Sequence, residues 1–137
     1  FRRVLFRSLT ALEATALNLS GTALVTLSAC STGLGSQATG EGVYGLQRAL
    51  RVAGARSTLL SLWKVDDRAT RVFMELYYTL LQQGVGRAEA LREVQRQFRD
   101  APIKNGLLLG WSHPHYWAAW QLSGDGNPLP KGDRSSR

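Results

Sequence analysis

The chain has 137 residues, of which 44% are hydrophobic, and it carries a formal net charge of +7. This length suits one domain or part of one, and the hydrophobic share excludes a disordered chain. No run of about 18 apolar residues is present, so we expect no membrane span. The single cysteine cannot form a disulfide within the chain and fits a reducing compartment such as the cytoplasm.

The positive charge is concentrated at the two ends of the chain. Between Leu9 and Pro130 there are 11 basic and 9 acidic residues, so the body is nearly neutral. It shows no basic stripe with interleaved aromatic residues, and we therefore expect no specific nucleic-acid partner. We divide the sequence into a basic leader that can be foreign to the fold (1–8), one domain (9–125) and a polar basic tail (126–137).

The first half of the chain alternates predicted helices and strands. Thr10 and Glu13 form a capping box that predicts a short helix ending near Leu17. Residues 23–29 are apolar at nearly every position, which is typical of a strand buried on both faces.

A glycine-rich loop then leads to a second helix and a second strand. Glu41 opens the helix, where its carboxylate suits the dipole or braces the preceding loop, and Gly54 ends it as a left-handed cap. Residues 57–63 are again a short apolar run, and we predict a strand there.

The second half is mainly helical and closes with a strand. Apolar residues at i, i+3, i+4 and i+7 predict an amphipathic helix that Asp66 or Asp67 caps and that Gly84 ends. A further helix is predicted over 87–99 and a last strand over 116–122.

Strands that alternate with helices predict an α/β fold with a mostly parallel sheet and helices on both faces. Three strands are few for such a sheet, whose usual size is about five or six. We therefore expect further strands before residue 1.

Cys30 follows the first predicted strand and precedes the loop Ser31-Thr32-Gly33. In parallel sheets, functional groups gather at the carboxyl ends of the strands. Loop amides there can stabilise a thiolate or an oxyanion, which makes Cys30, Ser31 and Gly33 candidate site residues. The alternative is that Cys30 is a small buried core residue, since free cysteines are among the most often buried residues.

Several stretches in order resemble the CHAT domain, a caspase-like cysteine peptidase domain often found with tetratricopeptide repeats in bacteria. They are LSACSTGLG (27–35), GEGVYGLQRAL (40–50), AGARSTLLSLWKVDD (53–67), AEALREVQRQF (88–98) and HPHYWAAWQLSGD (113–125). The resemblance implies a caspase-like three-layer αβα fold, truncated at the N-terminus, of which this chain is the carboxyl-terminal part. It also implies a bacterial, cytoplasmic protein.

The resemblance assigns Cys30 as the nucleophile of a Cys-His dyad, with no metal or cofactor. The family's histidine belongs to a His-Gly element before Leu9, which this sequence does not contain. Its histidines, His113 and His115, follow the last helix instead, so we expect the chain alone to be inactive. The implied partners are a polypeptide substrate and the tetratricopeptide-repeat region of the parent protein.

Asp66, Asp67 and His113 are candidates for a substrate pocket that would accept a basic side chain, although we favour helix capping as the role of one aspartate. Two other functions remain open. The chain can be a non-catalytic protein-interaction or regulatory module of the same fold. Residues 33–38 also match a dinucleotide fingerprint, but the helix that should start inside it is expected only near Glu41.

Overall fold

A computed structural model describes residues 10–28, 40–101 and 110–131. Its elements follow the predicted order, with one additional helical turn before the last strand. They are α1 (Ala11–Thr15), β1 (Val25–Leu27), α2 (Gly40–Val52), β2 (Ser57–Ser61), α3 (Asp67–Gln82), α4 (Arg87–Arg99), α5 (Pro114–Trp117) and β3 (Trp120–Gly124). In the described part of the chain, no helix is long and apolar enough to cross a membrane.

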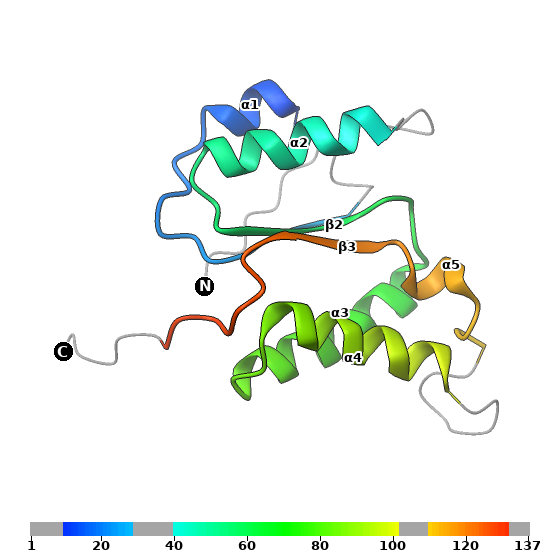
Figure 1. The fold of residues 1–137 in the computed structure, drawn as a ribbon. Coiled ribbons are helices and arrows are strands. Elements are labelled where there is room, and N and C mark those ends of the chain that lie inside the picture. Colours follow the sequence, from blue (N-terminus) through cyan, green and yellow to red (C-terminus); the bar gives the residue numbers. More distant parts are fainter. Residues whose placement is uncertain (1–9, 29–39, 102–109, 132–137) are drawn as a thin grey trace.

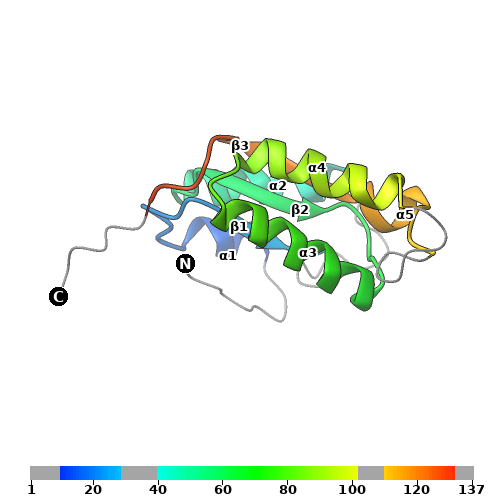
Figure 2. The same cartoon turned by 90° about the horizontal axis from the view of Figure 1, so that it is seen from below.

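The three strands form one sheet in the order β1-β2-β3. β1 and β2 are parallel, whereas β2 and β3 are antiparallel. Helices α1 and α2 cover one face of the sheet, and α3 and α4 cover the other (Figure 1; Figure 2). The fold is therefore α/β with three layers, as predicted, and the described sheet is mixed because its last strand is antiparallel.

The central strand β2 belongs to both halves of the core. All five of its residues are buried. Successive side chains point to opposite faces, so Leu59 packs with the cluster under α3 and α4 while Leu60 packs with the cluster under α1 and α2. Each such leucine contributes roughly 2 kcal/mol of hydrophobic stabilisation. β2 thus joins two hydrophobic clusters that otherwise lie on opposite sides of the sheet.

The predicted signals at the ends of the first two helices are confirmed. Thr10 caps α1 through a full capping box with Glu13. After α2 the backbone turns at Gly54, with a φ of +114°, and a Cβ there would lie 2.7 Å from the backbone nitrogen of Ser20. Gly54 is therefore required both by its backbone conformation and by the close approach of the neighbouring chain.

The position predicted for the last strand, 116–122, is wrong by about one helical turn. His113 caps α5 and Pro114 occupies its first turn, so β3 begins only at Trp120. Proline at the start of a helix has a favourable φ and lacks only an N–H that would be unpaired. This local signal for a helix outweighs the apolar run that suggested an extended strand.

Residues beyond β3 continue along the body of the domain. Leu129 packs against the cluster under α3 and α4. The carbonyl oxygens of Gly126 and Asn127 accept hydrogen bonds from the first backbone N–H groups of α4. This segment therefore serves as the cap of α4, which has no side-chain cap of its own.

Candidate functional site

The carboxyl ends of β1 and β2 lie at the same end of the sheet because the two strands are parallel. β3 is antiparallel, so it begins at this end, where Trp120 pairs with Ser61. We call the end of the sheet where β1 and β2 end and β3 begins the carboxyl rim. Cys30, Ser31 and Gly33 lie outside the described residues, and β1 ends three positions before Cys30 in the sequence.

The first turn of α3 brings two exposed aspartates to the carboxyl rim. Asp66 is the N-cap, and its Oδ1 accepts hydrogen bonds from the backbone N–H groups of Arg68 and Ala69, both at 3.0 Å. Asp67 is the first residue of the helix. The structure thus explains Asp66 by capping, while a pocket formed by Asp66 and Asp67 stays a prediction.

His113 and His115 lie next to each other at α5, and each has a structural role. Nδ1 of His113 accepts a hydrogen bond of 3.1 Å from the backbone N–H of His115. The ring of His115 stacks on Trp63 with a centroid distance of 6.2 Å, and Nε1 of Trp63 donates to the His115 carbonyl oxygen at 2.9 Å. These contacts attach α5 to the end of β2, and a substrate-pocket role for His113 stays a prediction.

Arg87 was not singled out from the sequence, yet its side chain has the most polar partners in the described structure. Its side chain is 1% exposed and forms an ion pair with Asp125, with Nη2 2.8 Å from Oδ2. Nε donates to the carbonyl oxygen of Asn127 at 2.8 Å, and Nη1 donates to Ser57 Oγ at 2.9 Å and to the carbonyl oxygen of Ala23. We call this group the Arg87 clamp.

The Arg87 clamp lies at the end of the sheet opposite to the carboxyl rim, because Ser57 is the first residue of β2. A cation in the first turn of a helix is disfavoured by the helix dipole, and this is the one sequence signal that could have marked Arg87. Its partners come from distant parts of the chain, so their convergence was not predictable. The clamp is structural and does not belong to the candidate site.

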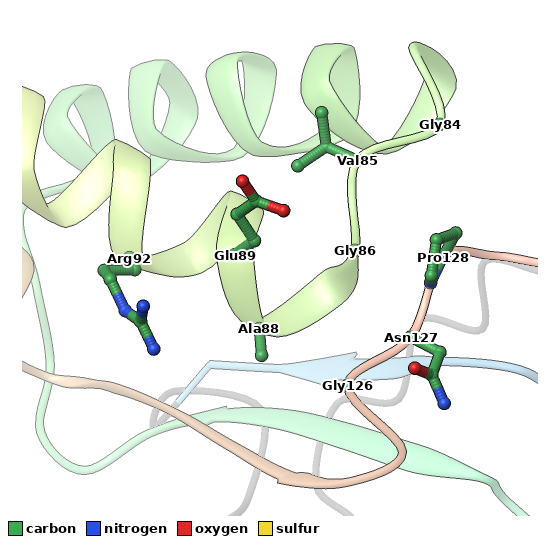
Figure 3. A pocket seen from close by; sticks show the side chains of 9 residues that line it. All are labelled: Gly84, Val85, Gly86, Ala88, Glu89, Arg92, Gly126, Asn127 and Pro128. Carbon is green, nitrogen blue, oxygen red and sulfur yellow. The ribbon is translucent and has the colours of Figure 1, made fainter.

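An open pocket of about 460 Å³ lies beside the clamp, between the start of α4 and the segment after β3 (Figure 3). Its polar side chains are those of Glu89, Arg92 and Asn127. The backbone N–H groups of Arg87 and Ala88, which could have bound an anion, already donate to carbonyl oxygens of the chain. The carboxyl rim therefore remains the candidate functional site.

Comparison with known proteins identifies the family of the chain. The model of the CHAT domain family matches residues 4–125, and the chain belongs to this family. It is 34% identical over 89 residues to tetratricopeptide repeat protein 28 of Homo sapiens, a match that covers 65% of this chain and 3% of the human protein. It is 32% identical over 116 residues to the same protein of Mus musculus, covering 85% of this chain and 4% of the mouse protein.

The chain therefore spans only a few per cent of the length of these relatives. Their name agrees with the association of the CHAT domain with tetratricopeptide repeats. No solved structure matches the chain.

Proposed function

We propose that this chain carries the nucleophile, Cys30, of a caspase-like CHAT cysteine endopeptidase domain. The observation that supports this most is the placement of β1. It runs parallel to the fully buried β2 and ends three positions before Cys30, at the rim where α3 also begins. Loops that follow parallel strands at this edge are the usual position for catalytic groups in open α/β sheets.

The proposed reaction is acyl transfer to the thiol. The Cys30 sulfur attacks the scissile carbonyl carbon, and a histidine takes the thiol proton and returns it to the leaving amine. Water then hydrolyses the thioester, releasing the carboxylic acid and restoring the thiol. Backbone N–H groups of Cys30, Ser31 and Gly33 are the proposed donors to the oxyanion.

The general base is not supplied by either histidine of this chain. Nδ1 of His113 is occupied as the cap of α5, and His115 stacks on Trp63. Both precede β3, which is separated from β1 by β2. Two strand spacings amount to roughly 10 Å, whereas a Cys–His hydrogen bond needs about 3 Å. We therefore propose that the histidine is contributed by sequence outside these residues, and that the chain alone does not cleave peptides.

Asp67 is the proposed contact for a basic substrate side chain. It is exposed at the start of α3, and its neighbour Asp66 already uses Oδ1 in capping. The polypeptide substrate would thus lie along the carboxyl rim. The repeat region of the parent would position this substrate, and the cytoplasm, which keeps the thiol reduced, is the proposed location.

Labelling of the full-length parent with a peptidyl chloromethyl ketone tests the proposal. The Cys30 thiolate should displace the chloride and form a thioether, and Cys30→Ala should abolish the label. A variant lacking the proposed upstream histidine should also lose it, whereas His115→Ala should keep it. Equal labelling with and without that histidine would mean that Cys30 is an ordinary accessible thiol, and the domain would then be a non-catalytic interaction module.

Nucleotide binding receives no support from the fold. The fingerprint at 33–38 needs a helix that starts inside it, so that the helix N-terminus faces the pyrophosphate. α2 begins at Gly40, after the fingerprint has ended.

A further inference from the structure

The hydrogen bonds at both ends of β3 fix which of its backbone groups face away from the sheet. The N–H of Leu62 donates to the carbonyl oxygen of Ala119 at 2.8 Å, and the N–H of Asp125 donates to that of Arg56 at 3.0 Å. In an antiparallel pair, hydrogen-bonded positions alternate with positions whose groups point outward. The odd-numbered residues of β3 therefore bond to β2, and the even-numbered residues face the open edge.

Among the described residues, the outer edge of β3 has a hydrogen-bond partner only at its beginning. The carbonyl oxygen of Trp120 accepts a hydrogen bond from Gln95 Nε2 at 3.1 Å. Farther along, Leu122 and Gly124 present their N–H and C=O groups outward, and within the described part of the chain no strand pairs with this edge. Such an edge is a template for an added strand.

A groove of about 560 Å³ lies between α2 and β3, next to this edge. Its lining residues are Tyr44, Gln47, Arg48, Arg51, Val52 and Ser123. Tyr44 and Val52 are 59% and 72% exposed, and Leu12 is the only other exposed large hydrophobic residue in the described part of the chain. The groove therefore offers apolar contact area next to unpaired backbone groups.

Two amide side chains in this layer each have one buried atom without a hydrogen-bond partner among the described residues. Gln47 lines the groove and is only 7% exposed, and the atom without a partner is its Nε2. In Gln121 it is the buried Oε1. Gln121 pairs with Leu60, which packs toward α2, so both amides lie on the same face of the sheet. A buried polar group without a partner is costly, and a bound polypeptide that supplied the missing partners would remove that cost.

The charge of the groove selects the kind of polypeptide. Arg48 and Arg51 are exposed, no acidic residue lines the groove, and neither arginine pairs with a described carboxylate. A second copy paired edge to edge through β3 would bring these arginines toward their own equivalents, and the like charges would repel. We propose that the groove binds an extended, acidic segment of a partner polypeptide, which adds to the sheet as a strand beside β3.

Binding in this groove does not depend on the chemistry of Cys30, and fluorescence anisotropy tests it on the whole chain. The probe is a short labelled peptide in which glutamate alternates with valine. The first control peptide has lysine in place of glutamate. The second carries N-methyl groups on alternate backbone nitrogens along one edge, which removes strand pairing and keeps the charge. The expected result is that only the unmodified acidic peptide binds.

Protein variants then locate the binding. Arg48→Glu with Arg51→Glu should weaken binding of the acidic peptide about tenfold, because two attractive charge contacts become repulsive. Arg68→Glu with Arg92→Glu changes the net charge equally on the α3 and α4 side, and should leave the affinity unchanged. Gln47→Leu should weaken binding about threefold through loss of its donor. Circular dichroism checks that each variant is folded.

Three outcomes would overturn the proposal. The N-methylated peptide could bind as tightly as the parent peptide, which would mean that charge alone attracts it. The two arginine pairs could have equal effects, which would place the binding elsewhere. Sedimentation could show a dimer that pairs through β3, which would make the occupant a second copy of the chain.

Discussion

The guanidinium of Arg87 and the carboxylate of Asp125 form an ion pair whose two partners differ sharply in exposure, at 1% and 34%. The arginine comes from the first turn of α4 and the aspartate from the residue after β3. One buried cation thus holds the carboxyl end of β3 against α4, a helix on the lower face of the sheet in Figure 1.

Replacing Arg87 should destabilise the fold more than replacing an exposed arginine of the same helix. Arg87→Met leaves the carbonyl oxygen of Asn127 without its charged donor, and is expected to lower the free energy of unfolding by about 3 kcal/mol. Urea denaturation followed by circular dichroism measures the change. Arg92→Met, on the exposed side of α4, is the matched control and should cost less than about 0.5 kcal/mol. Equal losses in the two variants would show that the clamp adds nothing.

The carboxylate of Asp125 should make the stability of the fold sensitive to acid. The backbone N–H of Asn127 donates to Asp125 and, together with the charge of Arg87, holds the pKa of Asp125 below its ordinary value. A carboxyl group has a pKa of about 3.9 in the unfolded chain, so the stabilisation is present above that pH and is lost as the pH falls through the lower folded value.

Asp125→Asn should therefore be less stable than the wild type at neutral pH, and the difference should shrink as the pH falls below about 4. Denaturation midpoints measured from pH 7 downward give this difference. A gap that stayed constant over the range would mean that the charge of Asp125 has no role.

Two glycines make a paired test of backbone constraint. Gly124 has a φ of +96°, and an added Cβ would lie 2.4 Å from the carbonyl oxygen of Arg56. Gly124→Ala should therefore cost at least about 2 kcal/mol. Gly45 lies within α2 with open space around it, so Gly45→Ala should stabilise the protein by about 0.5–1 kcal/mol. Thermal melts of the two variants should shift in opposite directions.

Substitutions of the two aspartates at the start of α3 should have different effects. Asp66→Ala removes the cap and is expected to cost about 0.5–2 kcal/mol, whereas Asp66→Asn keeps the acceptor and most of the stability. Asp67→Asn should leave stability nearly unchanged. In the full-length parent it should reduce cleavage after basic residues, measured as a lower kcat/KM. An unchanged preference would remove the proposed pocket.

His113 should prove dispensable for catalysis. Asparagine is also a good N-cap, so His113→Asn should keep α5 folded while removing the imidazole. The parent's labelling by the peptidyl electrophile should then be unchanged. Loss of labelling in a folded variant would show that His113 takes part in activating the thiol.

Local patterns were sufficient to predict most elements. The periodicity of α3 predicted its buried face, where Ala69, Phe73 and Tyr77 are fully enclosed. The bounds of α4 also agree with the predicted range, 87–99. Such features depend on neighbours in sequence, and the sequence contains them directly.

Features that depend on contacts between distant residues were missed. Nothing near Arg87 in the sequence indicates that Ser57 and Asp125 would converge on it. The last strand was predicted at the wrong position because its apolar run fits a helical turn as well as a strand. The cap at His113 favours the helical turn. The candidate site was inferred from the carboxyl rim, where β1 ends, and its central residue, Cys30, lies outside the described structure.

The Arg87 clamp also has a consequence for synthesis on the ribosome. The chain is made from its amino end, so α4 emerges before Asp125 and Asn127 exist as partners for the arginine. Until those residues leave the exit tunnel, the guanidinium can be buried only without its counter-charge, which is unfavourable. Completion of this domain is therefore expected to wait for its last segment, and nascent chains stalled before residue 125 should remain sensitive to protease.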